Sequence, residues 1–100
     1  MVSVNKFECD KTKARSNLVK HGLRFTEGCR IFEGLTLTAE SKHNQKLNER
    51  RFVTIGALDD QSAAVLVWTE RKGNIRVISS RKASQKEREA YYAHIKKTIN

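Results

Sequence analysis

The sequence predicts an α+β fold, an antiparallel β-sheet with two N-terminal helices and a C-terminal helix. Helix signals come first along the chain and strand signals follow, without the strand–helix alternation that builds parallel sheets. The last third of the chain holds a hairpin pattern, AVLVWTERKGNIRVISSRK, and then a capped helix. With 100 residues, the chain is expected to form a single domain over residues 1–100.

The N-terminal part is expected to contain a short strand around Val4–Glu8 and a helix over Lys11–Lys20. Asp10 precedes the helix, where its carboxylate can accept hydrogen bonds from free amides of the first turn. Gly22 follows it, and glycine is favoured just past a helix C-terminus. Two of the four residues on one helix face are polar and are expected to hydrogen-bond neighbouring loops. The four are Ala14, Asn17, Leu18 and His21.

A second, short helix is predicted over Glu27–Phe32, with Thr26 as its N-cap and with Cys29 and Phe32 facing inward. The following segment, Leu35–Ala39, has the pattern of a short extended stretch.

The middle of the chain is the poorest in apolar residues. Glu40–Arg50 has a single one, Leu47, among charged and amide residues, which is typical of a mobile loop. Arg51–Leu58 then has the pattern of a strand, and the cluster Asp59–Ser62 predicts a turn.

The hairpin that follows organises the predicted sheet. Ala64–Thr69 is an apolar strand, Lys72–Asn74 supplies a turn with residues that tolerate positive φ, and Ile75–Arg81 returns. Side chains alternate across a strand, so we expect Arg76 either to reach the rim of the sheet or to hold an anionic partner. One face is predicted to carry Ile75, Val77, Ser79 and Arg81, and the other Arg76, Ile78 and Ser80.

The last helix is predicted over Gln85–Lys97, because Ser84 and Glu87 match a capping box. Its apolar side is marked by Tyr91, Ile95 and Ile99.

The net charge of +9 indicates a polyanionic partner, which can be nucleic acid, acidic lipid or an acidic protein. The basic residues concentrate in two stretches, Lys11–Arg24 and the segment from Glu70 to the end. We expect these stretches to build one positive surface. The alternative is two solvated faces on opposite sides of the domain.

The two cysteines, Cys9 and Cys29, show neither metal-ligand spacing nor a CxxC pair. The sequence has no leader-like N-terminus and no apolar run of membrane-spanning length. We therefore expect a cytoplasmic, reducing setting without membrane contact, in which both cysteines are free thiols filling core space. The sequence leaves a disulfide between them open.

The residue types of the hairpin suit RNA cleavage without metal or cofactor. In this reaction a ribose 2′-OH attacks phosphorus, and fixed guanidinium groups stabilise the extra charge of the transition state. Glu70 or His21 can act as the base, and His21 or Lys20 as the acid. The structural alternatives are that Glu70 only pairs with Arg71 or Arg76, and that Arg81 only neutralises the C-terminal end of a helix.

Three motifs in order resemble the BrnT family, toxins of type II toxin–antitoxin systems with a RelE-like ribonuclease fold. The first is KFECD with Asn17 and KHGLRF, the second is ERRFVTIG, and the third is TER, RVISSRKA, ER and Tyr91. The family often has Trp where this chain has Cys9, so the resemblance implies a missing packing group at the end of the first strand.

The resemblance implies an mRNA-cleaving toxin that is neutralised by BrnA, a small antitoxin with a ribbon-helix-helix DNA-binding part. The complex would repress its own operon, so operator DNA would be reached only through the antitoxin. Rival hypotheses are a non-catalytic basic module that binds nucleic acid or an acidic protein, and a degenerate toxin that retains only antitoxin binding. The site residues that the resemblance implies are Lys20, His21, Glu70, Arg71, Arg76 and Arg81.

Overall fold

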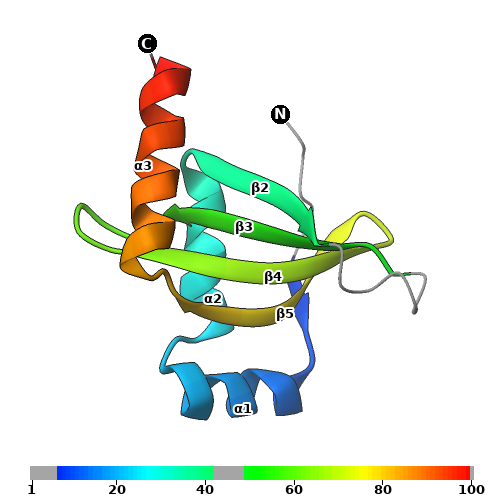
Figure 1. The fold of residues 1–100 in the computed structure, drawn as a ribbon. Helices are drawn as coiled ribbons and strands as arrows, with labels where there is room; N and C mark the ends of the chain where they lie inside the picture. The colour runs from blue at the N-terminus through cyan, green and yellow to red at the C-terminus, as the bar shows by residue number, and fades with distance from the viewer. Residues whose placement is uncertain (1–6, 42–48, 100) are drawn as a thin grey trace.

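The computed structural model describes residues 7–41 and 49–99, which form a five-stranded sheet with helices on both of its faces (Figure 1). The strand order is β1-β5-β4-β3-β2. The strands are β1 (Phe7–Cys9), β2 (Thr36–Ser41), β3 (Arg51–Ala57), β4 (Ala63–Arg71) and β5 (Asn74–Lys82). The helices are α1 (Lys11–His21), α2 (Phe25–Gly28), the 3₁₀ helix η1 (Cys29–Glu33) and α3 (Gln85–Ile99).

The predicted α+β class is confirmed, but the sheet is mixed rather than purely antiparallel. Strands β2 to β5 pair antiparallel, whereas β1 pairs parallel with β5, with Phe7 opposite Ile75. Two parallel strands need a long connection between them. Here α1, α2 and the other strands lie between β1 and β5 in the sequence, so β1 can run alongside β5 in the same direction. Of the predicted first strand Val4–Glu8, residues 4–6 lie outside the described residues.

Both predicted caps of α1 are confirmed. Asp10 Oδ1 accepts hydrogen bonds from the amides of Thr12 and Lys13, at 2.8 and 3.2 Å. Gly22 has a φ of +71° and donates its amide to Leu18 O at 2.8 Å. The helix runs one residue further than predicted, to His21.

The predicted cap of the second helix is wrong. The N-cap is Arg24 rather than Thr26, and the Arg24 amide donates to Glu27 Oε1 at 3.2 Å. The Glu27 side chain therefore reaches back to the helix start, which places Thr26 inside the helix. Cys29 and Phe32 pack against the core, as predicted.

The extended segment predicted at Leu35–Ala39 is a full strand, β2, which pairs with β3. Glu40 therefore belongs to a strand rather than to the predicted loop, and its carboxylate receives two hydrogen bonds from Arg50, at 3.0 and 3.1 Å. Ser41 also belongs to β2, whereas Glu49 and Arg50 lie in neither a helix nor a strand. Residues 42–48 of that prediction lie outside the described residues.

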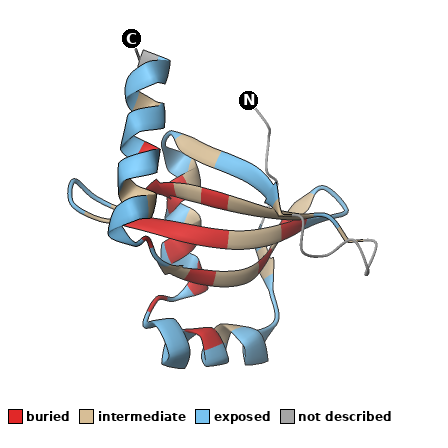
Figure 2. Ribbon diagram, viewed as in Figure 1, coloured by how far each residue is buried: buried red, intermediate tan, exposed pale blue. Residues whose placement is uncertain are grey.

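The sheet separates two apolar clusters (Figure 2). On one face, Leu66 of β4 and Ile31 of η1 are fully buried where α2 and η1 pack on the sheet. On the other face, Val65 packs with Ala63 and Ala83 near α3. Among the described residues, no helix is both long enough and apolar enough to cross a membrane.

Helix α3 is fixed at its start and along its side. The capping box is confirmed, because the Ser84 amide donates to Glu87 Oε1 at 2.8 Å and the Glu87 amide donates to Ser84 Oγ at 3.3 Å. Tyr91 is buried and its hydroxyl donates to Leu35 O at 2.7 Å, which ties α3 to the start of β2.

A β-bulge in β5 overturns the predicted faces of the hairpin strand. Val67 lies opposite Ser79 and Trp68 lies opposite Val77, so Ile78 has no partner in β4. The extra residue shifts the alternation of side chains by one position. Arg76 and Arg81, predicted on opposite faces, therefore share one.

Candidate functional site

A groove of about 270 Å³ lies between α1 and the bulged part of β5. Two predicted site residues, Lys20 and His21, line it from the last turn of α1. Ile78 and Ser79 line it from the strand. Because the bulge is at Ile78, both strand residues reach the groove where regular alternation would have turned one of them away.

The predicted arginines of β5 project from one face on either side of these groove residues. Arg76 lies opposite Thr69 and Arg81 lies opposite Val65, and both partners are on the same face of β4. Arg76 Nη1 lies 3.6 Å from Glu8 Oε1, which confirms the expected anionic partner.

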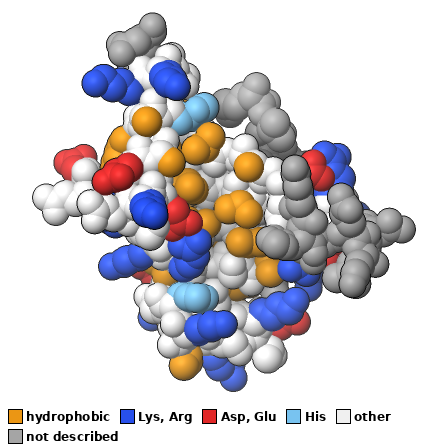
Figure 3. All heavy atoms as spheres, viewed as in Figure 1, with side chains coloured by type: hydrophobic (Ala, Val, Ile, Leu, Met, Phe, Trp, Pro, Cys, Tyr) orange, Lys and Arg blue, Asp and Glu red, His pale blue; other side chains and the backbone are white. Residues whose placement is uncertain are grey.

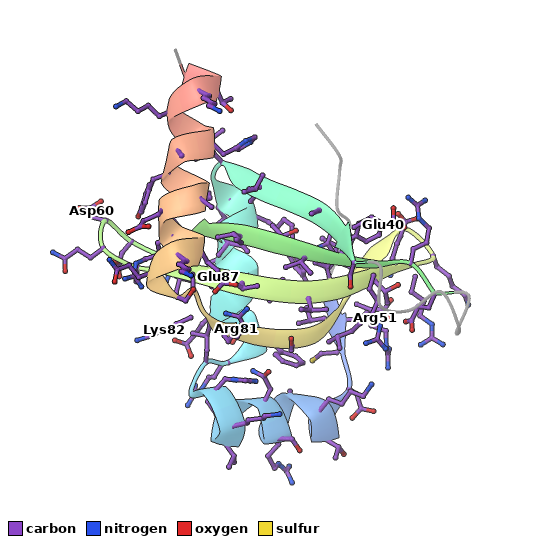
Figure 4. All side chains as sticks on the ribbon, in the orientation of Figure 1. Glu40, Arg51, Asp60, Arg81, Lys82 and Glu87 are labelled. Carbon is purple, nitrogen blue, oxygen red and sulfur yellow. The ribbon has the colours of Figure 1, made fainter. Side chains whose placement is uncertain are left out.

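Arg81 is held in a two-point ion pair with Glu87 of α3 (Figure 4). Its Nη1 and Nη2 donate to the two Glu87 carboxylate oxygens, each at 2.7 Å. These hydrogen bonds lower the pKa of Glu87 to about 2, so the pair stays ionised at neutral pH. The ion-pair partner of Arg81 thus lies in the first turn of α3 rather than at the C-terminal end of a helix.

The structure does not bring Glu70 and Arg71 into this groove. Glu70 lines a separate cavity of about 320 Å³ with Phe52 and Arg50. It lies opposite Ile75, on the sheet face away from Arg76 and Arg81. Arg71 is exposed at the end of β4, beside the turn. Among the described residues, the ion pairs do not include Glu70, so its predicted pairing with Arg71 or Arg76 is not found.

Four residues of α1 line the groove but were not predicted as site residues, and one of them, Asn17, is buried. The four are Thr12, Lys13, Ser16 and Asn17. The spacing of Lys13, Asn17 and Lys20 places them on one helix face, and this signal was available in the sequence. The predicted face shares Asn17 and His21 with the groove, but it was centred on Leu18, which is 37% exposed.

The first basic stretch lines this groove with Lys13 and Lys20, and the second reaches it through Ile78 and Ser79. Lys and Arg side chains gather over β5 and α1 in Figure 3, below hydrophobic side chains that gather over the middle of the sheet. The face shown therefore carries basic side chains of both stretches, as expected for one positive surface.

Both cysteines are free thiols, but only one occupies core space as predicted. Cys29 packs against the core, and burial raises the pKa of its thiol to about 11. Cys9 is exposed and borders an apolar cleft of about 320 Å³ with Leu18 and Phe25. This cleft lies where the resemblance implied a missing packing group.

Comparisons with known proteins agree with the motifs. The family model described as ribonuclease toxin BrnT of type II toxin–antitoxin systems matches residues 9–87. The crystal structure of the Brucella abortus ribonuclease toxin BrnT superposes with a TM-score of 0.65 and 25% identity. The match covers 83% of this chain and 100% of that chain. No curated protein matches the chain. Because the family model spans most of the sequence, the chain belongs to the BrnT family of ribonuclease toxins of type II toxin–antitoxin systems.

Proposed function

We propose that this chain is an endoribonuclease that cleaves mRNA without a metal ion, and that the groove between α1 and β5 is its active site. The observation that carries the proposal is that Lys20 and His21 line one groove with Ser79, which shares a face of β5 with Arg76 and Arg81. Family membership supports a ribonuclease, and this groove supplies the chemical groups that RNA cleavage needs.

The chemistry assigns a role to each group. In the proposed reaction the ribose 2′-OH loses its proton and attacks the adjacent phosphorus, and the 5′-oxygen leaves with a proton. His21 exchanges these protons, since an imidazole ring can both accept and donate a proton. Lys20 and the guanidinium group of Arg81 stabilise the negative charge that grows on the phosphate oxygens. Arg76, which pairs with Glu8 just before the start of α1, binds a neighbouring phosphate of the RNA. The products are a 2′,3′-cyclic phosphate and a 5′-hydroxyl.

Arg81 retains donors for this role after pairing with Glu87. A guanidinium has five N–H groups in a fixed fork. Two point at Glu87, and one reaches Lys82 O at 3.3 Å. The remaining two can bind phosphate oxygens, while the ionised Glu87 holds the fork in place.

Glu70 and Arg71 remain proposed site residues, but as RNA contacts outside the groove. Glu70 lies opposite Ile75, which precedes Ser79 by four residues, roughly 13 Å along the strand at 3.3 Å per residue. This separation supports His21, rather than Glu70, as the residue that accepts and donates the protons.

Family membership also supports an antitoxin partner. We propose a BrnA-like ribbon-helix-helix protein that neutralises the enzyme, with the complex binding operator DNA through the antitoxin and repressing its own operon. An mRNA substrate would place the activity in the cytoplasm.

The test is cleavage of an end-labelled mRNA fragment by the purified protein in excess EDTA. We expect cleavage with 2′,3′-cyclic phosphate ends, while DNA of the same sequence stays intact because it lacks the attacking hydroxyl. Cleavage only after Mg²⁺ is added, or equal cleavage of the DNA, would contradict the mechanism. RNA binding without any cleavage would favour the non-catalytic binding module.

A further inference from the structure

We propose that Asn17 is a positioning residue for RNA cleavage. Its side chain holds α1 against the bulged part of β5, and so sets the spacing between the proton-transferring groups on the helix and Arg81 on the strand. This inference rests on the proposed function, because it concerns the same groove.

The Asn17 amide uses both of its polar ends on backbone atoms. Its Nδ2 donates to Leu23 O at 2.9 Å and to Ser80 O at 2.7 Å, and its Oδ1 accepts from the Ser80 amide at 3.0 Å. The residue is 6% exposed. Buried hydrogen bonds of this kind are costly to break, because each unpaired group stays desolvated.

Asn17 takes the place of a missing strand neighbour. The edge strand β1 covers β5 only from Ile75 to Val77. Beyond Val77 the outward amide and carbonyl of β5 need another partner. At Ser80, both the amide and the carbonyl form hydrogen bonds with the Asn17 side chain of α1. Within the described part of the chain, every hydrogen bond found between α1 and β5 involves Asn17.

Ser80 is also held from the side of α2. A side chain at Gly28 would run into Ser80 Oγ, so the two backbones approach closely there. Ser80 is fully buried. The strand directly after the bulge is therefore enclosed between α1 and α2, and the Asn17 hydrogen bonds to the Ser80 backbone fix its position.

The Asn17 contacts lie between the groups that must act together. Lys20 and His21 follow Asn17 by about one helical turn, roughly 5 Å along the axis. Ser79 and Arg81 adjoin Ser80 on either side in the sequence. A misplacement of about 1 Å between reacting groups can cost a hundredfold in rate. Loosening the Asn17 contacts should therefore slow the chemical step more than it weakens RNA binding.

The experiment compares Asn17→Asp with the wild type at a temperature where both are folded, using single-turnover cleavage and RNA affinity. The ionised carboxylate can still accept from the Ser80 amide but cannot donate to either carbonyl. We expect the cleavage rate to fall at least about tenfold, with RNA affinity within about threefold. Below the pKa of the new carboxyl, its protonated form can donate again, so the rate relative to wild type should recover as the pH falls.

Ser80→Ala is the matched control. It keeps the backbone atoms that Asn17 binds and removes only a buried hydroxyl that has no hydrogen-bond partner. We expect unchanged cleavage and an equal or higher thermal midpoint. Should Asn17→Asp fail to fold, Asn17→Gln replaces it. That variant keeps all the polar groups and adds one methylene, and the same loss of rate is expected.

A folded Asn17 variant that cleaves within threefold of the wild type would overturn the inference. Equal losses of binding and cleavage, or a slower Ser80→Ala variant, would overturn it too. A wild-type protein that does not cleave RNA at all would instead refute the proposed function, so the two failures are distinguishable.

Discussion

Replacing Arg81 by alanine is expected to lower the single-turnover rate of RNA cleavage at least about a hundredfold. The guanidinium projects from the same strand face as Arg76, two residues beyond Ser79 of the groove. It is oriented by two hydrogen bonds of 2.7 Å to Glu87. A preorganised cation of this kind favours the transition state over the ground state, because the charge on the phosphate oxygens grows during attack. Cleavage of end-labelled RNA with enzyme in excess measures the effect.

The control for this prediction is Glu87→Gln, which disturbs the same ion pair from its other end. It removes the anionic partner and weakens the start of α3, but the variant still carries the Arg81 guanidinium. We expect a lower thermal midpoint but a cleavage rate within about tenfold of the wild type. If both variants lose cleavage equally, and in proportion to lost stability, Arg81 has a structural role only.

Replacing Leu66 by alanine is expected to destabilise the fold by about 3 kcal/mol, because a fully buried leucine leaves a cavity in the core. Leu66 lies in the cluster beneath α2 and η1, where Phe25 and Ile31 surround it. In a domain of this size the thermal midpoint should fall by about 12 to 24 °C. Thermal unfolding followed by circular dichroism measures the shift.

The same variant should still cleave RNA when it is assayed well below its transition. Leu66 points to the sheet face away from Arg76 and Arg81, so its loss changes the folded fraction and not the groups that contact phosphate. A midpoint unchanged from the wild type would show that this core is not packed as described. Loss of cleavage at full folding would show that the site depends on the core directly.

Features encoded by neighbouring residues could be predicted from the sequence. Asp10, Gly22 and the pair Ser84 and Glu87 act on backbone within a few residues, so their local patterns suffice. The α+β class followed from the order of such local signals. The turn at Gly73 also followed, since glycine tolerates the φ of +82° found there.

Features that join distant parts of the chain could not be predicted. The hydrogen-bond partner of Asn17 lies 63 residues away in β5, and no local pattern encodes that distance. The bulge at Ile78 carries no glycine or proline signal, so strict alternation placed Arg76 and Arg81 on opposite faces. The same register places Glu70 on the other side of the sheet from them, although all three are close in the sequence.

The central claim is that RNA binds where α1 meets the bulge of β5. The most direct measurement is an NMR titration of ¹⁵N-labelled protein with an RNA that is 2′-O-methylated throughout, which occupies the site but cannot supply the attacking hydroxyl. Our account predicts the largest amide shifts at Lys20, His21 and Ser79–Arg81. Shifts confined to Glu70, Arg71 and the cavity beside Phe52, or no shifts in the groove at saturation, would contradict it.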